Sequence, residues 1–485
     1  MNRSRFIKYT LFVLIFCLPQ GALHAQQQLA SWWAAQMQAP DYRQAWDGVY
    51  IYELTQDKEI LNVHAERLLA PASVMKLLTT ATALQLLGPN FRYETGIYAV
   101  GTVSGRCLDG YLMIAPSGDP SLGSRYFADT LPAAFLEALG AALRHHAIDS
   151  ISRGVCLLKT PYDPNVTPDG WTWEDLGNYY AAPAYELNWR DNTLYAYFTP
   201  GSAPGQPAVL RKIEPSLPFT VDSWVNQVTT GEAGSGDRVY ADRAAYQTHG
   251  FLRGTYPMGG TFSVKLMMHD PTVYFLQEVQ TFFEKSKIKC RLSVAAPCRV
   301  EQPANVRLLW TYRSPALLDI ITETNQKSIN LFAEGLYKTL AIRMGSTRAH
   351  NDAAEVIKAF WRGQGVALDN ARILDGSGLS PANALSPKSI VEVLRFMAHT
   401  PYAEDFRRSL AQAAHSGTLR RFGVGTPLAG RVWAKTGSMR DVACLAGYYH
   451  SVSGRRYAFA LMMNKAEASY TKVLSLYEQL LQQLP

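Results

Sequence analysis

Residues 70–80 read Ala-Pro-Ala-Ser-Val-Met-Lys-Leu-Leu-Thr-Thr, and the apolar run that they begin continues almost unbroken to Gly88. Pro71 suits the first turn of a helix, where its missing N–H costs nothing. The apolar residues that follow predict a buried helix. Ser73 and Lys76 lie three positions apart, so one helical turn brings the hydroxyl and the amine to the same face.

A hydroxyl beside an amine is a candidate nucleophile with its base. A serine attacks only when a neighbouring base takes its proton. A lysine has an ordinary pKa near ~10.4, so this pKa must fall by about three units, roughly 4 kcal/mol, before the amine accepts a proton near neutral pH. Burial beside a second cation lowers the pKa in this direction. The plainer interpretation is a core helix with one polar pair, and this motif alone favours it.

A second motif, Ser328-Ile329-Asn330, lies between two stretches of helical pattern within residues 312–344. A hydroxyl two residues before an amide, in a short turn between helices, can present both groups to a cleft. Ser328 is then able to relay a proton between Lys76 and a leaving amine, while Asn330 donates to a substrate carbonyl. The alternative is an ordinary helix cap, which serine and asparagine favour.

A third motif, Lys435-Thr436-Gly437-Ser438, lies on the first of three predicted strands near the end of the chain. The other two strands cover residues 442–449 and 457–463, and a helix over 470–484 follows them. On an edge strand beside a cleft, Lys435 supplies charge, Thr436 a hydroxyl, and Gly437 room for a ligand backbone. These groups predict a carboxylate site. The alternative is a solvated edge strand that its lysine protects from aggregation.

The first 25 residues have the pattern of a secretory signal peptide. Basic residues at positions 3, 5 and 8 precede an apolar core over 9–18 that is too short to span a bilayer. Ala25 offers a cleavage position. Without this segment the formal net charge falls by three from +7. We therefore expect a mildly basic protein that is exported and soluble.

Charge and motif composition exclude several classes of function. The basic residues are scattered, without the clustered stripe that nucleic-acid binding needs. Their mild excess fits loose attraction to an anionic surface or polymer. The chain has no His-Glu-x-x-His and no Cys-x-x-Cys motif, so we expect neither a metal site nor a cofactor.

Five cysteines follow the signal: Cys107, Cys156, Cys290, Cys298 and Cys444. An oxidising compartment permits disulfides. Their spacing suggests one bridge between Cys290 and Cys298 and another between Cys107 and Cys156. Cys444 is then a buried thiol on a strand. Sequence spacing does not determine the connectivity, so other pairings stay open.

Outside the motifs, the sequence pattern predicts different secondary structure in different regions of the chain. A hairpin is expected over 48–64, helices over 131–145 and 271–286, and strands broken by glycine and proline over 195–261. We infer that one domain is interrupted after the Ser73 helix and resumes about 200 residues later, an interval that is itself the size of a domain.

The three motifs in this order resemble those of penicillin-binding proteins and class A β-lactamases. The chain is most similar to the class C low-molecular-mass penicillin-binding proteins, the D-alanyl-D-alanine carboxypeptidase/endopeptidase family of the penicillin-binding protein 4 type. Residues 375–380 (Asp-Gly-Ser-Gly-Leu-Ser) and 171–192 carry the resemblance further. The long interval between Lys76 and Ser328 is also typical of that family. The resemblance covers nearly the whole mature chain.

The resemblance implies an α/β (α+β) architecture, the penicillin-binding-protein/β-lactamase-like transpeptidase fold. In this fold helices flank an antiparallel sheet, and two smaller domains are inserted here. We therefore expect a signal peptide over 1–25 and a discontinuous serine peptidase domain over 26–98 and 305–485. An inserted domain II covers 99–190 and 270–304, and an inserted β-rich domain III covers 191–269.

The resemblance also implies a role for each motif. Ser73 is the acylated nucleophile and Lys76 its base, while Ser328 and Asn330 complete the proton relay and position the substrate. Lys435 and Thr436 hold the terminal carboxylate of D-Ala-D-Ala. The backbone N–H groups of Ser73 and Ser438, next to Gly437, form the oxyanion hole, and losing one such donor typically costs about 10²–10³ in rate.

The implied reaction cleaves peptidoglycan stem peptides, either at the terminal D-Ala or at a cross-link, and β-lactams acylate the same serine. Asp175 matches a position that recognises the side chain of the stem. Departures from the family pattern occur at Ile329, at Pro381, where a basic residue is common, and at Arg440, where an amide side chain is common. Recognition of the free end of diaminopimelate is therefore expected to differ. A homodimer is left open.

Two other functions share part of this pattern. A class A β-lactamase needs a short interval between the first two motifs and a Glu-x-x-Leu-Asn loop, but here Ala184 stands at the glutamate position before Leu187-Asn188. A wall-binding protein that keeps the fold without catalysis is the second alternative. The intact set of motif residues argues against it, and we expect a periplasmic serine D,D-peptidase.

Overall fold

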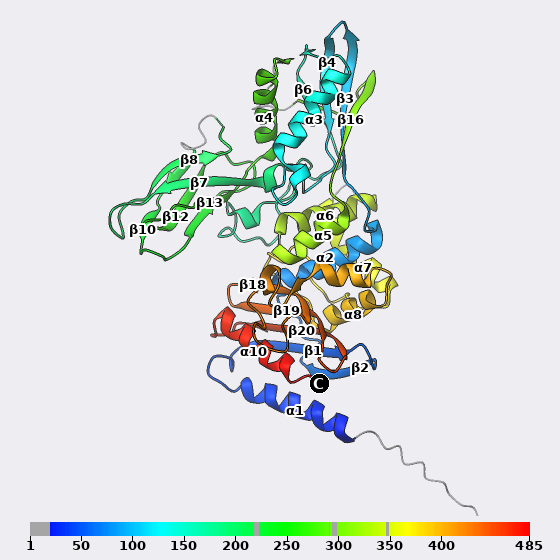
Figure 1. Cartoon of the computed structure of the whole chain (residues 1–485), viewed down its shortest axis with the longest axis vertical. Coiled ribbons are helices and arrows are strands. Elements are labelled where there is room, and N and C mark those ends of the chain that lie inside the picture. Colours follow the sequence, from blue (N-terminus) through cyan, green and yellow to red (C-terminus); the bar gives the residue numbers. More distant parts are fainter. Residues whose placement is uncertain (1–19, 218–222, 291, 293–297, 346–348) are drawn as a thin grey trace, which may run out of the picture.

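The computed structural model describes residues 20–217, 223–290, 292, 298–345 and 349–485. Its lower part in Figure 1 is an antiparallel sheet of six strands in the order β17-β18-β19-β20-β1-β2. The strands are β1 (Trp46–Glu53), β2 (Lys58–Val63), β17 (Ala411–Gln412), β18 (Val432–Met439), β19 (Val442–His450) and β20 (Arg456–Asn464). The expected hairpin and the three expected C-terminal strands are therefore confirmed, and β1 and β20 join the two ends of the chain.

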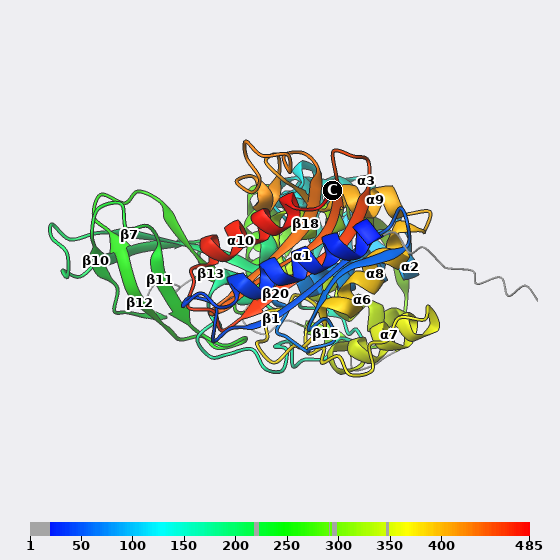
Figure 2. The same ribbon diagram turned by 90° about the horizontal axis from the view of Figure 1, so that it is seen from below.

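Helices cover both faces of this sheet. Helices α1 (Gln20–Gln36) and α10 (Tyr470–Gln482) lie on one face, seen from below in Figure 2. Alternate residues of β1 point to opposite faces. Val49 and Ile51 pack with α1 and α10, whereas Tyr50 and Tyr52 belong to the core on the other face. Each face of β1 is therefore buried against its own layer of helices.

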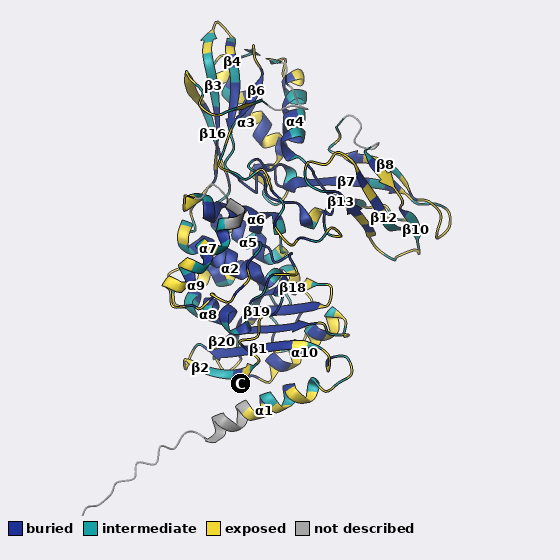
Figure 3. Cartoon of the chain, turned by 180° about the vertical axis from the view of Figure 1, so that it is seen from behind, coloured by how far each residue is buried: buried dark blue, intermediate teal, exposed yellow. Residues whose placement is uncertain are grey.

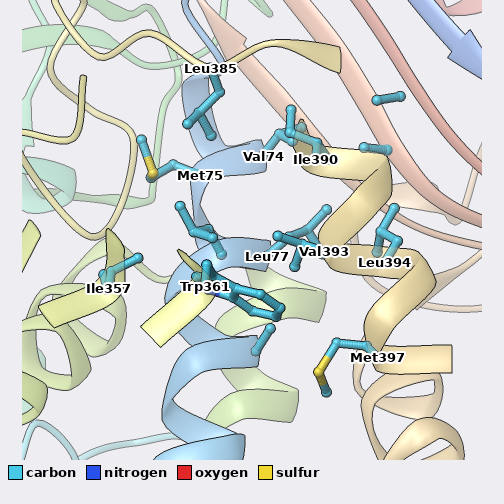
Figure 4. Close-up of a cluster of buried hydrophobic side chains, with 14 of the residues drawn as sticks. Val74, Met75, Leu77, Ile357, Trp361, Leu385, Ile390, Val393, Leu394 and Met397 are labelled. Carbon is cyan, nitrogen blue, oxygen red and sulfur yellow. The ribbon is translucent and has the colours of Figure 1, made fainter. Parts of the chain in front are cut away.

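Helix α2 (Met75–Leu87) forms the centre of the second layer and is buried from Met75 to Leu84. It follows a 3₁₀ turn, η1 (Ala72–Val74). Figure 4 shows side chains of α7 (Ala349–Gly363) and α8 (Pro387–Ala398) packed around it. The indole N–H of Trp361 donates to Thr82 Oγ1 over 2.8 Å, so even this polar contact lies inside the core. The predicted buried helix is confirmed.

Helices α5 (Leu317–Lys327) and α6 (Asn330–Arg343) lie above α2 and are separated by two residues only. Figure 3 shows that α6, like α2, is almost entirely buried. The expected helical region over 312–344 starts too early, because its first two residues end strand β16 (Val306–Arg313). The turn at the second motif is confirmed. Short α9 (Ala403–Ser409) completes this layer.

The upper part of Figure 1 contains a mixed seven-stranded sheet. The chain enters this part after α2 and returns to the lower part before α5. Its strands are β3 (Glu94–Ser104), β4 (Cys107–Ala115), β5 (Ser150–Ile151), β6 (Val155–Leu158), β14 (Lys289–Cys290), β15 (Cys298–Val300) and β16. Helices α3 (Pro132–His145) and α4 (Pro271–Lys285) pack beside it, as the sequence predicts.

Two smaller sheets form the arm on the left of Figure 1. One contains β7 (Thr193–Thr199), β8 (Val209–Glu214) and β13 (Ser263–Met267). The other contains β9 (Trp224–Asn226), β10 (Thr229–Gly231), β11 (Arg238–Asp242) and β12 (Gly250–Pro257). A single hydrophobic cluster runs from Ile97 of β3 through Phe198 to Leu252, so the arm and the seven-stranded sheet share one core.

The strand pairing differs from two of the predicted domain boundaries. The boundary at 98/99 divides β3, and that at 304/305 assigns β16 to the peptidase domain. In the structure β3 and β16 pair with each other over residues 94–100 and 306–313. Both strands therefore belong to the inserted sheet. The sequence does not reveal this, because the two strands lie about 200 residues apart and pair only when the two ends of the insertion meet.

The predicted disulfides are wrong. The structure joins Cys156 to Cys298, which face each other in the parallel pair β6–β15. Cys107 and Cys290 lie on opposite sides of β5 and are free. Cys444 is a buried thiol on β19, as predicted. The true partners are separated by 142 residues, so only the sheet register reveals the pair.

The described part of the chain contains no helix with the length and hydropathy needed to cross a membrane. The basic and apolar parts of the predicted signal lie outside the described residues. The predicted cleavage position after Ala25 falls within α1. The signal peptide and the export that it implies stay predictions.

Candidate active site

Ser73 lies in η1, directly before the N-terminus of the buried helix α2, and Lys76 lies one turn further along. The Lys76 side chain is completely buried. Its ammonium donates to Ser73 Oγ over 2.9 Å, to Asn330 Oδ1 over 2.6 Å and to the Ser377 carbonyl over 2.7 Å. The spacing of three residues therefore brings the hydroxyl and the amine into direct contact.

These three contacts determine where the lone pair of a neutral Lys76 points. The oxygens of Asn330 and Ser377 are carbonyl oxygens, which only accept hydrogen bonds. A neutral amine keeps two N–H donors and gains one lone pair. The two carbonyl groups hold the two donors, so the lone pair faces Ser73, the one partner with a proton to give. The geometry suits proton transfer from Ser73 to Lys76.

Burial supplies the pKa shift that this transfer needs. Loss of hydration lowers the pKa of Lys76 to about 7, although the nearby carboxylates of Asp375 and Glu334 oppose the change. Lys435 is also fully buried, and burial together with the neighbouring Lys76 lowers its pKa well below the usual range. The ammonium of Lys76 thus disfavours the charged form of Lys435.

The second motif joins both lysines. Ser328 ends α5 in the left-handed conformation, with φ 60° and ψ 40°, and this turn sets the direction of α6. Lys435 Nζ donates to Ser328 Oγ over 2.9 Å, while Asn330 accepts from Lys76. Ile329 is partly buried against the cluster that contains Phe332. The turn therefore presents its two polar side chains to the two lysines.

Strand β18 presents the third motif along an open edge. Strand β17 pairs only with Trp433 and Ala434, so Lys435 and the residues after it have a strand partner on one side, β19. Thr436 Oγ1 contacts Thr418 Oγ1 over 2.9 Å, from the 3₁₀ turn η5 (Gly417–Leu419). Ser438 is exposed. A ligand carboxylate can approach this edge.

Two glycines allow the Ser73 turn to pack closely between its neighbours. A Cβ on Gly437 would lie 2.5 Å from the Pro71 carbonyl oxygen, and one on Gly378 would lie 1.8 Å from that of Ala72. Gly378 also has φ +81°. Ala72 itself has φ 45°, a costly conformation for a residue with a side chain. The nucleophile therefore sits on a tight turn between β18 and the 375–380 loop.

Two buried carboxyl groups, of Glu334 and Asp375, hold the 375–380 loop beside Lys76. Glu334, completely buried on α6, accepts from the Ser377 N–H over 2.8 Å and from the Gly376 N–H over 3.3 Å. Burial and the neighbouring Asp375 raise the pKa of Glu334. Asp375 accepts from the Gly378 and Ser380 N–H groups. Glu334 thus holds the loop whose carbonyl holds Lys76.

Asp175 and Arg440 lie at the edge of the site and not in its hydrogen-bond network. Asp175 accepts from Thr172 Oγ1 over 2.8 Å and from the Tyr180 hydroxyl over 3.3 Å. Arg440 is exposed at the β18–β19 turn, and its guanidinium lies 3.3 Å from Glu174. The inserted segment still reaches the site directly, because Asn330 Nδ2 donates to the Tyr180 carbonyl over 2.7 Å.

Residues 27–482 match the model of the D-Ala-D-Ala carboxypeptidase 3 (S13) family. The chain belongs to this family. It is therefore a serine hydrolase of the D-alanyl-D-alanine carboxypeptidase class. Among the described residues, no group of three or more His, Cys, Asp or Glu side chains could hold a metal ion.

Relatives from distant organisms match this S13 chain over most of its length. A D-alanyl-D-alanine carboxypeptidase (DacB) of Haemophilus influenzae is 27% identical over 86% of this chain and 85% of its own. A D-alanyl-D-alanine carboxypeptidase of Actinomadura is 25% identical over 88% of this chain and 79% of its own. The crystal structure of penicillin-binding protein 4 from Haemophilus influenzae superposes with a TM-score of 0.77 at 22% identity, covering 90% of this chain and 96% of that one. The likeness shows the expected fold.

The S13 chain brings the five predicted reactive side chains into two hydrogen-bonded groups. One contains Ser73, Lys76 and Asn330, and the other contains Ser328 and Lys435. Sequence reasoning missed Glu334 and Thr418, and it quoted Asp375 and Ser377 without giving them a role. Glu334 lies four residues after Asn330 on α6, and a carboxylate one helical turn beyond the motif was the available signal.

Proposed function

We propose that Ser73 is the nucleophile of this family member and that Lys76 is its base. The single observation that carries the proposal is the set of three contacts of Lys76, two of them with carbonyl groups and the third with Ser73. The Ser73 oxygen attacks the carbonyl carbon of the D-Ala-D-Ala peptide bond, and its proton passes to Lys76. The backbone N–H groups of Ser73 and Ser438 stabilise the developing oxyanion.

The acyl-enzyme then forms by loss of the terminal D-Ala. The C–N bond breaks, and the proton on Lys76 reaches the leaving nitrogen through Ser328. Water hydrolyses the ester and restores Ser73. In its protonated form, which an approaching carboxylate favours, Lys435 has one N–H left after its contacts with Ser328 and the Thr436 carbonyl. This donor together with Thr436 Oγ1 binds the terminal carboxylate of the substrate.

We propose peptidoglycan stem peptides as the substrate, cleaved either at a D-Ala-D-Ala end or at a cross-link. Asp175 receives an amine of the stem. Arg440, which pairs with the neighbouring Glu174, helps to bind the stem at the same edge. Penicillin acylates Ser73 by the same route. We further propose export through the signal peptide over 1–25 and action in the periplasm. A homodimer remains a prediction.

A β-lactamase mechanism finds no support at the Leu187-Asn188 segment. Asn188 is completely buried, donates to the Asp119 carbonyl over 3.1 Å and accepts from the Tyr185 N–H over 2.9 Å. Its side chain is engaged in holding the inserted segment. We expect slow release of the penicilloyl group and no rapid turnover of nitrocefin.

The test is incubation of the exported protein with purified muropeptides, analysed by mass for loss of one alanine or for cross-link scission. Ser73→Ala is expected to abolish both reactions and the covalent labelling by fluorescent penicillin, with unchanged thermal unfolding. Residual turnover near a tenth of wild type, a loss of only ~1.4 kcal/mol, would mean that another residue attacks. Ser453→Ala, which changes an exposed serine in the turn between β19 and β20, serves as the matched control and retains labelling.

A further inference from the structure

Cationic side chains and tyrosines, all but one of them on the inserted part of the chain, lie beside the second motif. We call this group the cationic wall: Arg125, Tyr126, Tyr179, Lys265 and Lys327. The ammonium of Lys265 lies 5.2 Å from the centre of the Tyr179 ring, and that of Lys327 lies 4.9 Å from the Tyr126 ring. The Arg125 guanidinium lies 4.8 Å from the same Tyr126 ring. These are cation–π distances.

The cationic wall lies next to the second motif at two points. Lys327 directly precedes Ser328, and Tyr126 contacts Phe332 of α6 edge-on with ring centres 5.8 Å apart. At the other point, Tyr179 precedes Tyr180, whose carbonyl accepts from Asn330. Lys265 lies on β13, which packs against the turn η3 (Tyr179–Ala181), and this turn also contacts α6.

The charges of the cationic wall are not balanced within the described residues. Arg125 lies 3.7 Å from the buried Asp191, and Lys327 pairs with Glu323. Lys265 is exposed, and no carboxylate of the described chain lies within ion-pair distance of it. Partial burial and then Arg125 lower the pKa of Lys265, whereas Asp191 and Asp237, which lie beyond ion-pair distance, oppose this change. One ammonium therefore stays open to an external anion.

From this arrangement we propose that Lys265, held by Tyr179 and flanked by Arg125, binds a carboxylate of the stem peptide other than the terminal one. This inference rests on the proposed function, which places the terminal carboxylate at Lys435. The Tyr179 ring, 44% exposed, offers an apolar surface beside the ammonium. The stem bears free carboxylates at its non-reacting residues, so a cation beside an aromatic ring matches its chemistry. The carboxylate comes either from the reacting stem or from the cross-linked second stem.

The test compares substrates with and without the side carboxylates. Lys265→Met is expected to lower kcat/KM about five- to tenfold for a stem peptide with free side carboxylates. The same variant should cleave a short blocked acyl-D-Ala-D-Ala, which has only its terminal carboxylate, at the wild-type rate. Amidation of the side carboxylates should slow the wild type by the same factor and leave Lys265→Met unaffected, because the two changes remove one interaction. A loss confined to cross-linked substrates would assign the carboxylate to the second stem.

Arg153→Met is the matched control. The Arg153 guanidinium lies 5.9 Å from the Tyr111 ring, at the seven-stranded sheet, and its loss changes the net charge equally. It should leave every substrate unaffected. An equal effect of Lys265→Met on the stem and on the short peptide, or no effect on either, would overturn the carboxylate subsite. Binding of a stem fragment without D-Ala-D-Ala to Ser73→Ala, measured by calorimetry, should weaken on adding Lys265→Met even when turnover is blocked.

Failure of the proposed function is recognised separately. In that case wild type fails to cleave the short peptide and fluorescent penicillin does not label Ser73. Wild type that cleaves both peptides, with Lys265→Met indistinguishable from it, refutes the subsite alone.

Discussion

At the scale of single residues, the reactivity of Ser73 depends on the charge of one buried amine. Burial favours the neutral form of Lys76, while Asp375 and Glu334 favour the charged form. The balance leaves its pKa at about 7, in the range where a base is both available and strong enough to accept a proton. Two backbone contacts of Glu334 hold the loop that orients the same amine.

The rate of acylation by penicillin should therefore rise with pH through a pKa of about 7 and level off above it, since only neutral Lys76 accepts the proton of Ser73. Glu334→Gln removes a carboxylate that raises this pKa. We expect the acidic limb of the pH–rate profile to move to lower pH, by up to about one unit. Stopped-flow measurement of labelling from about pH 5 to about pH 9, which covers the rising limb and the plateau, checks this.

The control for this prediction is Glu392→Gln, which removes a carboxylate of α8 that pairs with Arg395 away from the site. Its acidic limb should coincide with that of wild type. A limb that moves to higher pH in Glu334→Gln would show that Glu334 does not act on Lys76 through its charge.

At the scale of elements, the site depends on how closely β18 approaches the η1 turn. No side chain fits between them at Gly437, since a Cβ would lie 2.5 Å from the Pro71 carbonyl oxygen and 3.2 Å from the Ala72 Cβ. The same contact places the third motif beside Ser73. The pairing of β18 with β19 does not depend on it, so the fold and the alignment of the site are separable.

Gly437→Ala should push β18 away from the η1 turn and lower the acylation rate by about 100-fold, because misplacement near 1 Å costs this much. Thermal unfolding should change little, since the strands of the sheet stay paired. Penicillin labelling and calorimetry measure the two effects. Gly363→Ala is the control: its Cβ meets open space at the end of α7, so acylation should match wild type and the unfolding temperature should not fall. Wild-type acylation by Gly437→Ala would refute the proposed alignment.

At the scale of the whole molecule, helix α6 connects the peptidase core to the insertion. Its first residue, Asn330, contacts both Lys76 and the Tyr180 carbonyl. Further along, the buried ammonium of Lys338 donates to the carbonyls of Val166 and Ala184. The Cys156–Cys298 disulfide, by contrast, lies within the insertion and touches none of these contacts. It should govern the stability of the insertion and not the chemistry.

Replacing both Cys156 and Cys298 with alanine should lower the free energy of unfolding by about 2–4 kcal/mol, the usual contribution of a disulfide that closes a long loop. Penicillin labelling at about 25 °C, where both proteins are folded, should stay at the wild-type rate. Calorimetry of the full chain checks the first result. Cys107→Ala removes a free thiol of β4 and should leave the unfolding temperature unchanged. Loss of labelling in the folded double variant would show that the insertion controls the site.

The sequence alone determined the order of the three motifs, the buried helix at Ser73, the turn at Ser328 and the strands around Lys435. Each of these follows from local spacing and periodicity, which act within one or two turns of the chain. Only the tertiary structure decided the Cys156–Cys298 pair, the assignment of β3 and β16 to the insertion, and the place of Glu334 beneath Lys76. These contacts join residues far apart in the chain, and their register is set by how whole sheets and helices pack, which no local pattern records.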